Sequence, residues 1–173
     1  VFDLTTGESL YRYQDEKLYR PASIEKVITS VTALARLGAD YTMDTHLRYT
    51  GKIENDTLKG NLYLIGGFDP ELMDEDLDSL VAAVEAQGIR YVTDTIAADV
   101  SMTDSVYWGP GWSWDDTPYS FQPYLSPLML NRGCVDVSVS PAQKDSLPAV
   151  LCTPVSDYYR VCNRAVSRNP QAG

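Results

Sequence analysis

The stretch RPASIEKVITSVTALARLG, residues 20–38, decides the fold of the N-terminal part of this chain. After Pro21, apolar residues recur at the three- and four-residue intervals of one helical face, and Gly38 supplies a C-terminal stop. The pattern predicts a helix over residues 23–37. Ser23 and Lys26 would then lie on the same face of its first turn, because residues three apart are neighbours on a helix.

This Ser-x-x-Lys spacing suits nucleophilic catalysis. The Ser23 hydroxyl would lie within hydrogen-bond reach of the Lys26 amine as its base, and the positive end of the helix dipole would favour the developing oxyanion. To accept a proton, Lys26 must be neutral, and burial in a closed cleft promotes the neutral amine. A serine near a helix start is also a common cap. The spacing alone therefore leaves both readings open.

Other hydrolytic chemistries lack support in the sequence. His46 is the only histidine, and its place in a predicted strand favours a surface residue over a Ser-His-Asp triad. The 24 acidic residues single out no carboxylate pair. Three cysteines without a C-x-x-C spacing argue against zinc. In an oxidising compartment Cys152 and Cys162 could form a disulfide, and unpaired buried thiols, Cys134 included, are the alternative.

Charge and hydropathy limit the classes of partner that the chain can bind. The 173 residues carry a net charge of −10, which repels phosphate backbones and argues against nucleic acid. With 44% hydrophobic residues the chain is long enough to fold around a core. Its longest apolar runs, such as residues 62–65, fall well short of the ~20 residues of a membrane span. The sequence pattern therefore predicts no transmembrane segment in these 173 residues.

Outward from the helix, the pattern predicts alternating small elements. Short β-prone runs between turn residues predict strands. An apolar stripe predicts a second helix, capped by Asp74 and ended by Gly88. The tract rich in Trp, Tyr, Pro and Gly shows neither period and is predicted to be an ordered loop. The predicted segments are a hairpin over 1–13, an antiparallel unit over 46–65, strands at 89–92, 95–98 and 135–139, and the loop over 107–127.

Several stretches together resemble one family. The string around Ser23 and Lys26 is followed by others in the family's order, and the match covers nearly the whole chain. The matching segments are residues 20–26, 37–41, 60–70, 99–101, 109–116, 128–131 and 135–139. In these segments the chain resembles class C low-molecular-mass penicillin-binding proteins, which are D-alanyl-D-alanine carboxypeptidases and endopeptidases.

The resemblance implies a mixed α/β (α+β) fold: a serine hydrolase domain of the β-lactamase/DD-peptidase type, interrupted by small inserted β/α domains and only partly covered here. Residues 1–45 would begin the hydrolase domain, 46–133 form the first insert and 134–173 start a second, β-rich insert. Asp116 matches the family position that contacts the cationic end of the peptide side chain in peptidoglycan. A carboxylate there can pair with an ammonium group, and capping or solubilising the loop is its alternative role.

The resemblance also implies a reaction: Ser23 would be acylated by peptidoglycan stem peptides, or trapped by β-lactam antibiotics, with Lys26 as base and no metal or organic cofactor. The location implied is the periplasm or cell envelope. The balance of carboxypeptidase and endopeptidase action, the diamino acid of the peptide and the oligomeric state stay open. A different Ser/Lys acyl hydrolase, such as a β-lactamase or esterase, and a non-catalytic peptidoglycan-binding protein are the alternatives.

The family's later active-site motifs, a Ser-x-Asn and a Lys-Thr-Gly on an edge strand, are missing from their expected place. Ser167-Arg168-Asn169 fits the first pattern formally but comes too early, within a stretch that resembles the second insert. We interpret it as a coincidental match. Since the edge strand would supply the second oxyanion donor, we expect this stretch alone to be inactive.

Overall fold

The computed structural model describes residues 1–168. Its internal contacts divide the chain into two units, Val1–Thr42 and Met43–Gly173. The division falls close to the first boundary expected from the sequence, at residue 45. The further boundary at residue 133 stays a prediction.

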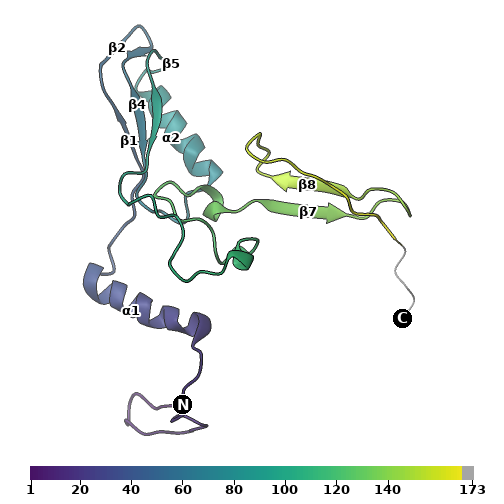
Figure 1. The fold of residues 1–173 in the computed structure, drawn as a ribbon. Helices are drawn as coiled ribbons and strands as arrows, with labels where there is room; N and C mark the ends of the chain where they lie inside the picture. The colour runs from purple at the N-terminus through teal and green to yellow at the C-terminus, as the bar shows by residue number, and fades with distance from the viewer. Residues whose placement is uncertain (169–173) are drawn as a thin grey trace. The chain divides into compact units, whose positions relative to one another are not determined.

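In the first unit the predicted helix is confirmed. It begins with a 3-10 turn, η1 (Ala22–Glu25), and continues as α1 (Lys26–Leu37). Gly38 ends it with a φ of 88°, and its N–H bonds the carbonyl of Leu34 at 3.0 Å. Figure 1 shows α1 as the one long helix of this unit.

The predicted hairpin over residues 1–13 is reduced to one antiparallel bridge between Phe2 and Ser9. The Asp3 carboxylate accepts the backbone N–H groups of Thr5, at 2.8 Å, and Thr6, at 3.4 Å, so the turn is closed by a side chain. Phe2 remains 58% exposed. A pair of strands that buries no apolar face gains too little to extend further.

The second unit contains two three-stranded sheets and a hairpin. In the first sheet, of order β1-β4-β6, β1 and β4 are antiparallel and β4 and β6 parallel; the second, of order β2-β3-β5, repeats this pattern with β2, β3 and β5. The antiparallel unit predicted over 46–65 is thereby confirmed. The strands are β1 (His46–Tyr49), β2 (Lys52–Glu54), β3 (Thr57–Lys59), β4 (Leu62–Ile65), β5 (Tyr91–Val92), β6 (Ile96–Asp99), β7 (Asp136–Ser140) and β8 (Ala149–Thr153).

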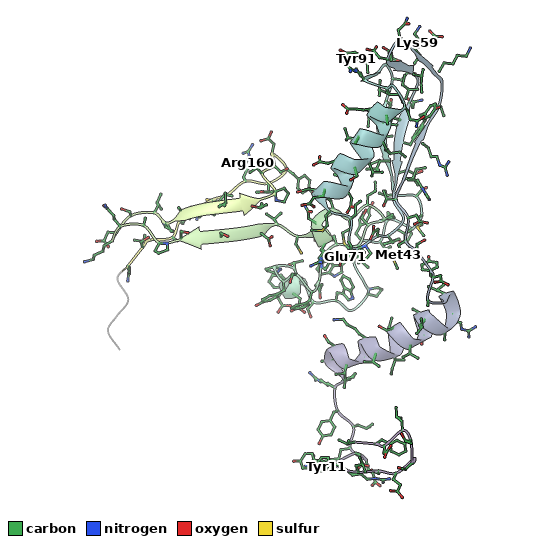
Figure 2. All side chains as sticks on the ribbon, turned by 180° about the vertical axis from the view of Figure 1, so that it is seen from behind. Tyr11, Met43, Lys59, Glu71, Tyr91 and Arg160 are labelled. Carbon is green, nitrogen blue, oxygen red and sulfur yellow. The ribbon has the colours of Figure 1, made fainter. Side chains whose placement is uncertain are left out.

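Two glycines divide the antiparallel unit over residues 46–65 between the two sheets. Gly51 and Gly60 face each other where the first sheet gives way to the second, with φ of 99° and 155°. A Cβ on Gly51 would lie 2.0 Å from the Lys59 carbonyl oxygen, and one on Gly60 1.9 Å from that of Thr50. The backbones approach too closely for any other residue. The antiparallel pairing therefore resumes beyond a kink as β2 and β3, and Figure 2 shows Lys59 of β3 and Tyr91 of β5 at the end of this unit that carries the second sheet.

Helix α2 (Asp74–Ala86) lies along the first sheet (Figure 1). Ala83 and Val84 line the same cavity as Leu47 of β1 and Leu62 of β4. Among the described residues, Leu58, Leu72 and Ile89 form the buried hydrophobic core of this unit, and Pro127 is also fully buried. The core thus forms between short strands and the loops that flank α2.

The predicted N-cap residue of α2, Asp74, is wrong: the cap lies one residue earlier, and Asp74 has a different hydrogen-bond partner. Met73 is the N-cap residue, and the Asp76 carboxylate accepts its N–H at 2.9 Å. Asp74 instead accepts a hydrogen bond from the side-chain amide of Asn131 at 3.1 Å. The carboxylate that the local sequence pattern predicted to cap the helix therefore makes a tertiary contact with Asn131 instead. The end at Gly88, with φ of 79°, is as predicted.

Strands β7 and β8 form the hairpin at the start of the predicted second insert. Cys152 pairs in register with Val137, and Cys134, Cys152 and Cys162 are all free thiols. No disulfide therefore joins Cys152 to Cys162, and the free thiols are not buried as expected: Cys134 and Cys152 are half-buried, and Cys162 is exposed. Among residues 1–168 no helix is long and apolar enough to cross a membrane.

Candidate active site

Ser23 and Lys26 are brought together by the first turn of the N-terminal helix. Ser23 lies in η1, Lys26 is the first residue of α1, and the Lys26 Nζ donates a hydrogen bond to the Ser23 Oγ at 3.1 Å. The same pair of atoms can exchange a proton in the opposite direction when the amine is neutral. The spacing read from the sequence thus corresponds to a direct contact.

The 3-10 turn explains why the two side chains meet. In a 3-10 helix residues i and i+3 eclipse each other, whereas in an α-helix they are offset. Pro21 precedes the turn with a φ of −69°, and its carbonyl accepts the N–H of Ile24 at 3.2 Å. The sequence pattern predicted an α-helical first turn. The tighter turn places Ser23 more directly over Lys26.

Both side chains are exposed within the described residues. The closed cleft that would favour a neutral amine is therefore not supplied by residues 1–42. Ile24, Val27, Ile28, Val31 and Leu34 of the helix are also exposed, each by more than half.

Asp116 lies in the second unit, at the end of a 3-10 turn, η2 (Trp114–Asp116). Its side chain is half-buried, whereas that of neighbouring Asp115 is exposed. Its backbone N–H bonds the carbonyl of Ser113 at 3.2 Å. Because Ser23 and Asp116 belong to different units, their use of one substrate stays a prediction.

The loop that carries Asp116 is ordered by its own contacts, as predicted. Its base is closed by the N–H of Leu125, which bonds the carbonyl of Tyr107 at 3.0 Å. Inside it, the Trp108 ring packs edge-on against Trp112, with centroids 5.6 Å apart, and in a tilted arrangement against Tyr124, with centroids 5.1 Å apart. Aromatic packing replaces regular secondary structure here.

Gln122 belongs to the same loop, and the sequence pattern did not single it out. Its side chain is only 9% exposed, and its Nε2 donates to the Ser113 carbonyl at 2.7 Å. A lone amide among Tyr, Phe and Pro residues was the available signal. Burial could not be inferred from an aperiodic segment.

Asp99 and Ser101 form a tight turn after β6. The Ser101 hydroxyl and its backbone N–H, the latter 2.9 Å from the Asp99 Oδ1, hold the pKa of the Asp99 carboxyl below its usual range. The sequence gives residues 99–101 no role beyond their resemblance to the family. The structure gives them a local one, closing the turn that follows the strand.

Ser167, the first residue of the formal Ser-x-Asn match, has a structural role. It is 8% exposed, and its Oγ accepts the N–H of Ala142 at 3.0 Å. Its own N–H and carbonyl bond Ser146 and Asp145 at 2.9 and 2.8 Å. These bonds tie the serine to the loop between β7 and β8. Asn169 lies outside the described residues.

Comparison with known proteins gives matches along the chain. The family model described as the D-Ala-D-Ala carboxypeptidase 3 (S13) family matches residues 1–172. A D-alanyl-D-alanine carboxypeptidase from an Actinomadura species is 34% identical over 173 residues, covering 96% of this chain and 32% of that protein. The D-alanyl-D-alanine carboxypeptidase DacB of Haemophilus influenzae is 31% identical over 153 residues, covering 85% and 32%. The chain thus spans about a third of the length of these relatives.

Solved structures match as well. The crystal structure of penicillin binding protein 4 from Haemophilus influenzae aligns with a TM-score of 0.72 and 27% identity, over 86% of this chain and 33% of that one. A structure of the same protein complexed with a novel β-lactam aligns with a TM-score of 0.60 and 22% identity, over 86% and 30%, which bears on the fold alone.

Proposed function

Because the chain belongs to the D-Ala-D-Ala carboxypeptidase 3 (S13) family, we propose that it is part of a penicillin-binding serine hydrolase that cleaves the D-alanyl-D-alanine end of peptidoglycan stem peptides. The observation that carries the proposal is the hydrogen bond of 3.1 Å between the Lys26 Nζ and the Ser23 Oγ. It joins a nucleophile and a base inside a family-wide match. The substrates are extracytoplasmic, which puts the protein in the periplasm or cell envelope.

In the proposed reaction the Ser23 Oγ attacks the carbonyl carbon of the penultimate D-alanine, and its proton passes to the neutral Lys26 amine. The tetrahedral intermediate collapses, the C–N bond breaks, and the Lys26 ammonium protonates the amine of the leaving D-alanine. Water then attacks the Ser23 ester, giving its proton to Lys26, which returns it to the Ser23 Oγ. A β-lactam would acylate the same oxygen, and water would hydrolyse the resulting acyl-enzyme slowly.

Two requirements lie beyond residues 1–42. Lys26 needs a covered environment, and the oxyanion needs a second donor besides the helix N-terminus. The chain contains no Lys-Thr-Gly sequence that could supply an edge-strand donor. We therefore expect activity from the full-length protein and none from the 173-residue chain.

Asp116 is proposed to bind the ammonium group on the diamino acid side chain of the stem peptide. Its half-buried side chain supports this role, because an ion pair gains strength when it is shielded from water. The net charge of −10 is unfavourable for polyanionic partners such as nucleic acid.

The test is release of D-alanine from a stem pentapeptide by the full-length protein and by Ser23→Ala. We expect the substitution to lower kcat by at least about 10³-fold, because it removes the oxygen that would be acylated. If the wild type binds the peptide without releasing D-alanine, the non-catalytic binding function replaces this one. If it hydrolyses simple esters or lactams but not the peptide, the other Ser/Lys hydrolases do.

A further inference from the structure

Gln122 is one of two buried polar residues in the part of the chain that the structure describes; the other is Ser167. Its neighbours Phe121 and Tyr124 are exposed by 67% and 62%. A buried amide has to be hydrogen-bonded to be tolerated. Its partner, the Ser113 carbonyl oxygen, can only accept, so the amide must present Nε2 to it.

The bond from Gln122 closes a ring of four hydrogen bonds around Asp116. The Ser113 carbonyl accepts both the Asp116 N–H, at 3.2 Å, and the Gln122 Nε2, at 2.7 Å. The Asp116 carbonyl accepts the N–H of Tyr119 at 3.0 Å, and the Tyr119 carbonyl accepts the N–H of Gln122 at 3.1 Å. Both backbone groups of Asp116 are therefore held within one closed ring.

The four links are not equivalent. Three are local backbone bonds between residues three apart, which a loop forms and breaks easily. The fourth spans nine residues, is the shortest of the four, and is the only one made by a side chain. Removing it opens the ring and leaves Ser113 and Asp116 free to move apart from Gln122. The backbone of Asp116 then loses its anchor, and the direction in which its side chain leaves the loop is no longer fixed.

We propose that Gln122 is a positioning residue for Asp116, holding the carboxylate in the orientation that selects a substrate with a cationic side chain. The inference rests on the proposed function, because it assigns Gln122 to the ammonium site formed by Asp116. Gln122 itself does not touch the substrate. Its effect is confined to the selectivity of the enzyme and leaves the acylation chemistry of Ser23 unchanged.

The experiment uses the full-length protein and two stem pentapeptides, one with a free side-chain ammonium at its third residue and one with that amine acetylated. The variants are Gln122→Met, which keeps the length but lacks the donor, and Gln122→Glu, which keeps the shape. Gln143→Met, at an exposed glutamine in the β7–β8 loop, is the matched control. Asp116→Asn reports on the ammonium site itself.

For both Gln122 variants we expect kcat/KM for the free-amine peptide to fall about tenfold, mainly through KM, as for a displaced charge-assisted contact. The acetylated peptide and the rate of acylation by benzylpenicillin should stay within about twofold of wild type. The ratio of kcat/KM for the free-amine peptide to kcat/KM for the acetylated peptide therefore falls toward the ratio measured for Asp116→Asn. Gln143→Met should keep the wild-type ratio.

Three outcomes would overturn the inference. If Asp116→Asn lowers the ratio and both Gln122 variants keep it, Gln122 does not position Asp116, and the function of Asp116 stands. If the Gln122 variants slow both peptides and benzylpenicillin equally, Gln122 only maintains the fold. If Asp116→Asn keeps the ratio, the ammonium site itself is wrong, and the role of Gln122 is lost with it.

Discussion

At the scale of single residues, the Lys26 Nζ and the Ser23 Oγ, 3.1 Å apart, are the two atoms between which acyl transfer would move a proton. Replacing Lys26 by Met keeps the apolar stem and removes the amine. We predict that benzylpenicillin acylates the full-length Lys26→Met variant about 10²–10⁴-fold more slowly, the range of general-base catalysis. Stopped acylation reactions analysed by intact mass measure the rate.

Lys17→Met is the matched control, because Lys17 is also an exposed lysine of the first unit and lies outside the Ser23 turn. It should be acylated at the wild-type rate. If Lys26→Met reacts as fast as Lys17→Met, Lys26 is not the base and another group must remove the proton.

Asp99 gives a prediction about pH. Its pKa is lowered first by the Ser101 hydroxyl and then by the Ser101 N–H. Because the folded pKa lies below the unfolded one, the carboxylate contributes stability above the unfolded pKa, and this is lost as pH falls through the folded value. Ser101→Ala should raise the pKa of Asp99 toward its usual range, as measured by NMR titration of the carboxyl carbon.

The matched control is Ser105→Ala, which removes a nearby hydroxyl and should leave the Asp99 titration unchanged. An Asp99 carboxyl that titrates identically in wild type and Ser101→Ala would show that the hydroxyl does not bond it. The backbone N–H of Ser101 would then be the sole local cause.

At the scale of elements, Leu58 is the best-buried position of the second unit, fully inaccessible within the three-residue strand β3. Leu58→Ala should lower the free energy of unfolding by about 2–5 kcal/mol, since it removes buried methyl groups and leaves a cavity. Urea unfolding followed by circular dichroism measures the change.

Val81→Ala removes two methyl groups from a side chain that is 58% exposed on α2. It should change the free energy of unfolding by about 0.5 kcal/mol or less. Equal losses for Leu58→Ala and Val81→Ala would mean that β3 is not part of the core.

The elements also show what sequence patterns can and cannot predict. Helix α1 and the end of α2 at Gly88 were predictable because an apolar stripe and a glycine stop are local signals. The kink between Gly51 and Gly60 was not, since it depends on two backbones meeting across a hairpin. Nor was the diversion of Asp74 to Asn131, whose partner lies 57 residues away.

The same distinction holds for the candidate site. The contact of Ser23 with Lys26 follows from a spacing of three residues, so the sequence contained it. The burial of Gln122 depends on the closure of an aperiodic loop onto Ser113, nine residues away, and no period reveals it. Local geometry was predictable, and loop closure was not.

At the scale of the whole molecule, Ser23 and Lys26 belong to the unit Val1–Thr42, and Asp116 belongs to the unit that begins at Met43. The chain covers 32% of the length of its carboxypeptidase relatives. The chemistry of the exposed Ser23–Lys26 pair is therefore a property to be measured in the full-length protein.

The most direct test is the intact mass of the full-length protein before and after incubation with benzylpenicillin, followed by peptide mapping. The account predicts one covalent adduct per chain, located on Ser23 and absent from Ser23→Ala. A folded full-length protein that gains no adduct, or gains it on a residue other than Ser23, would contradict the assignment of Ser23 as the acylated nucleophile.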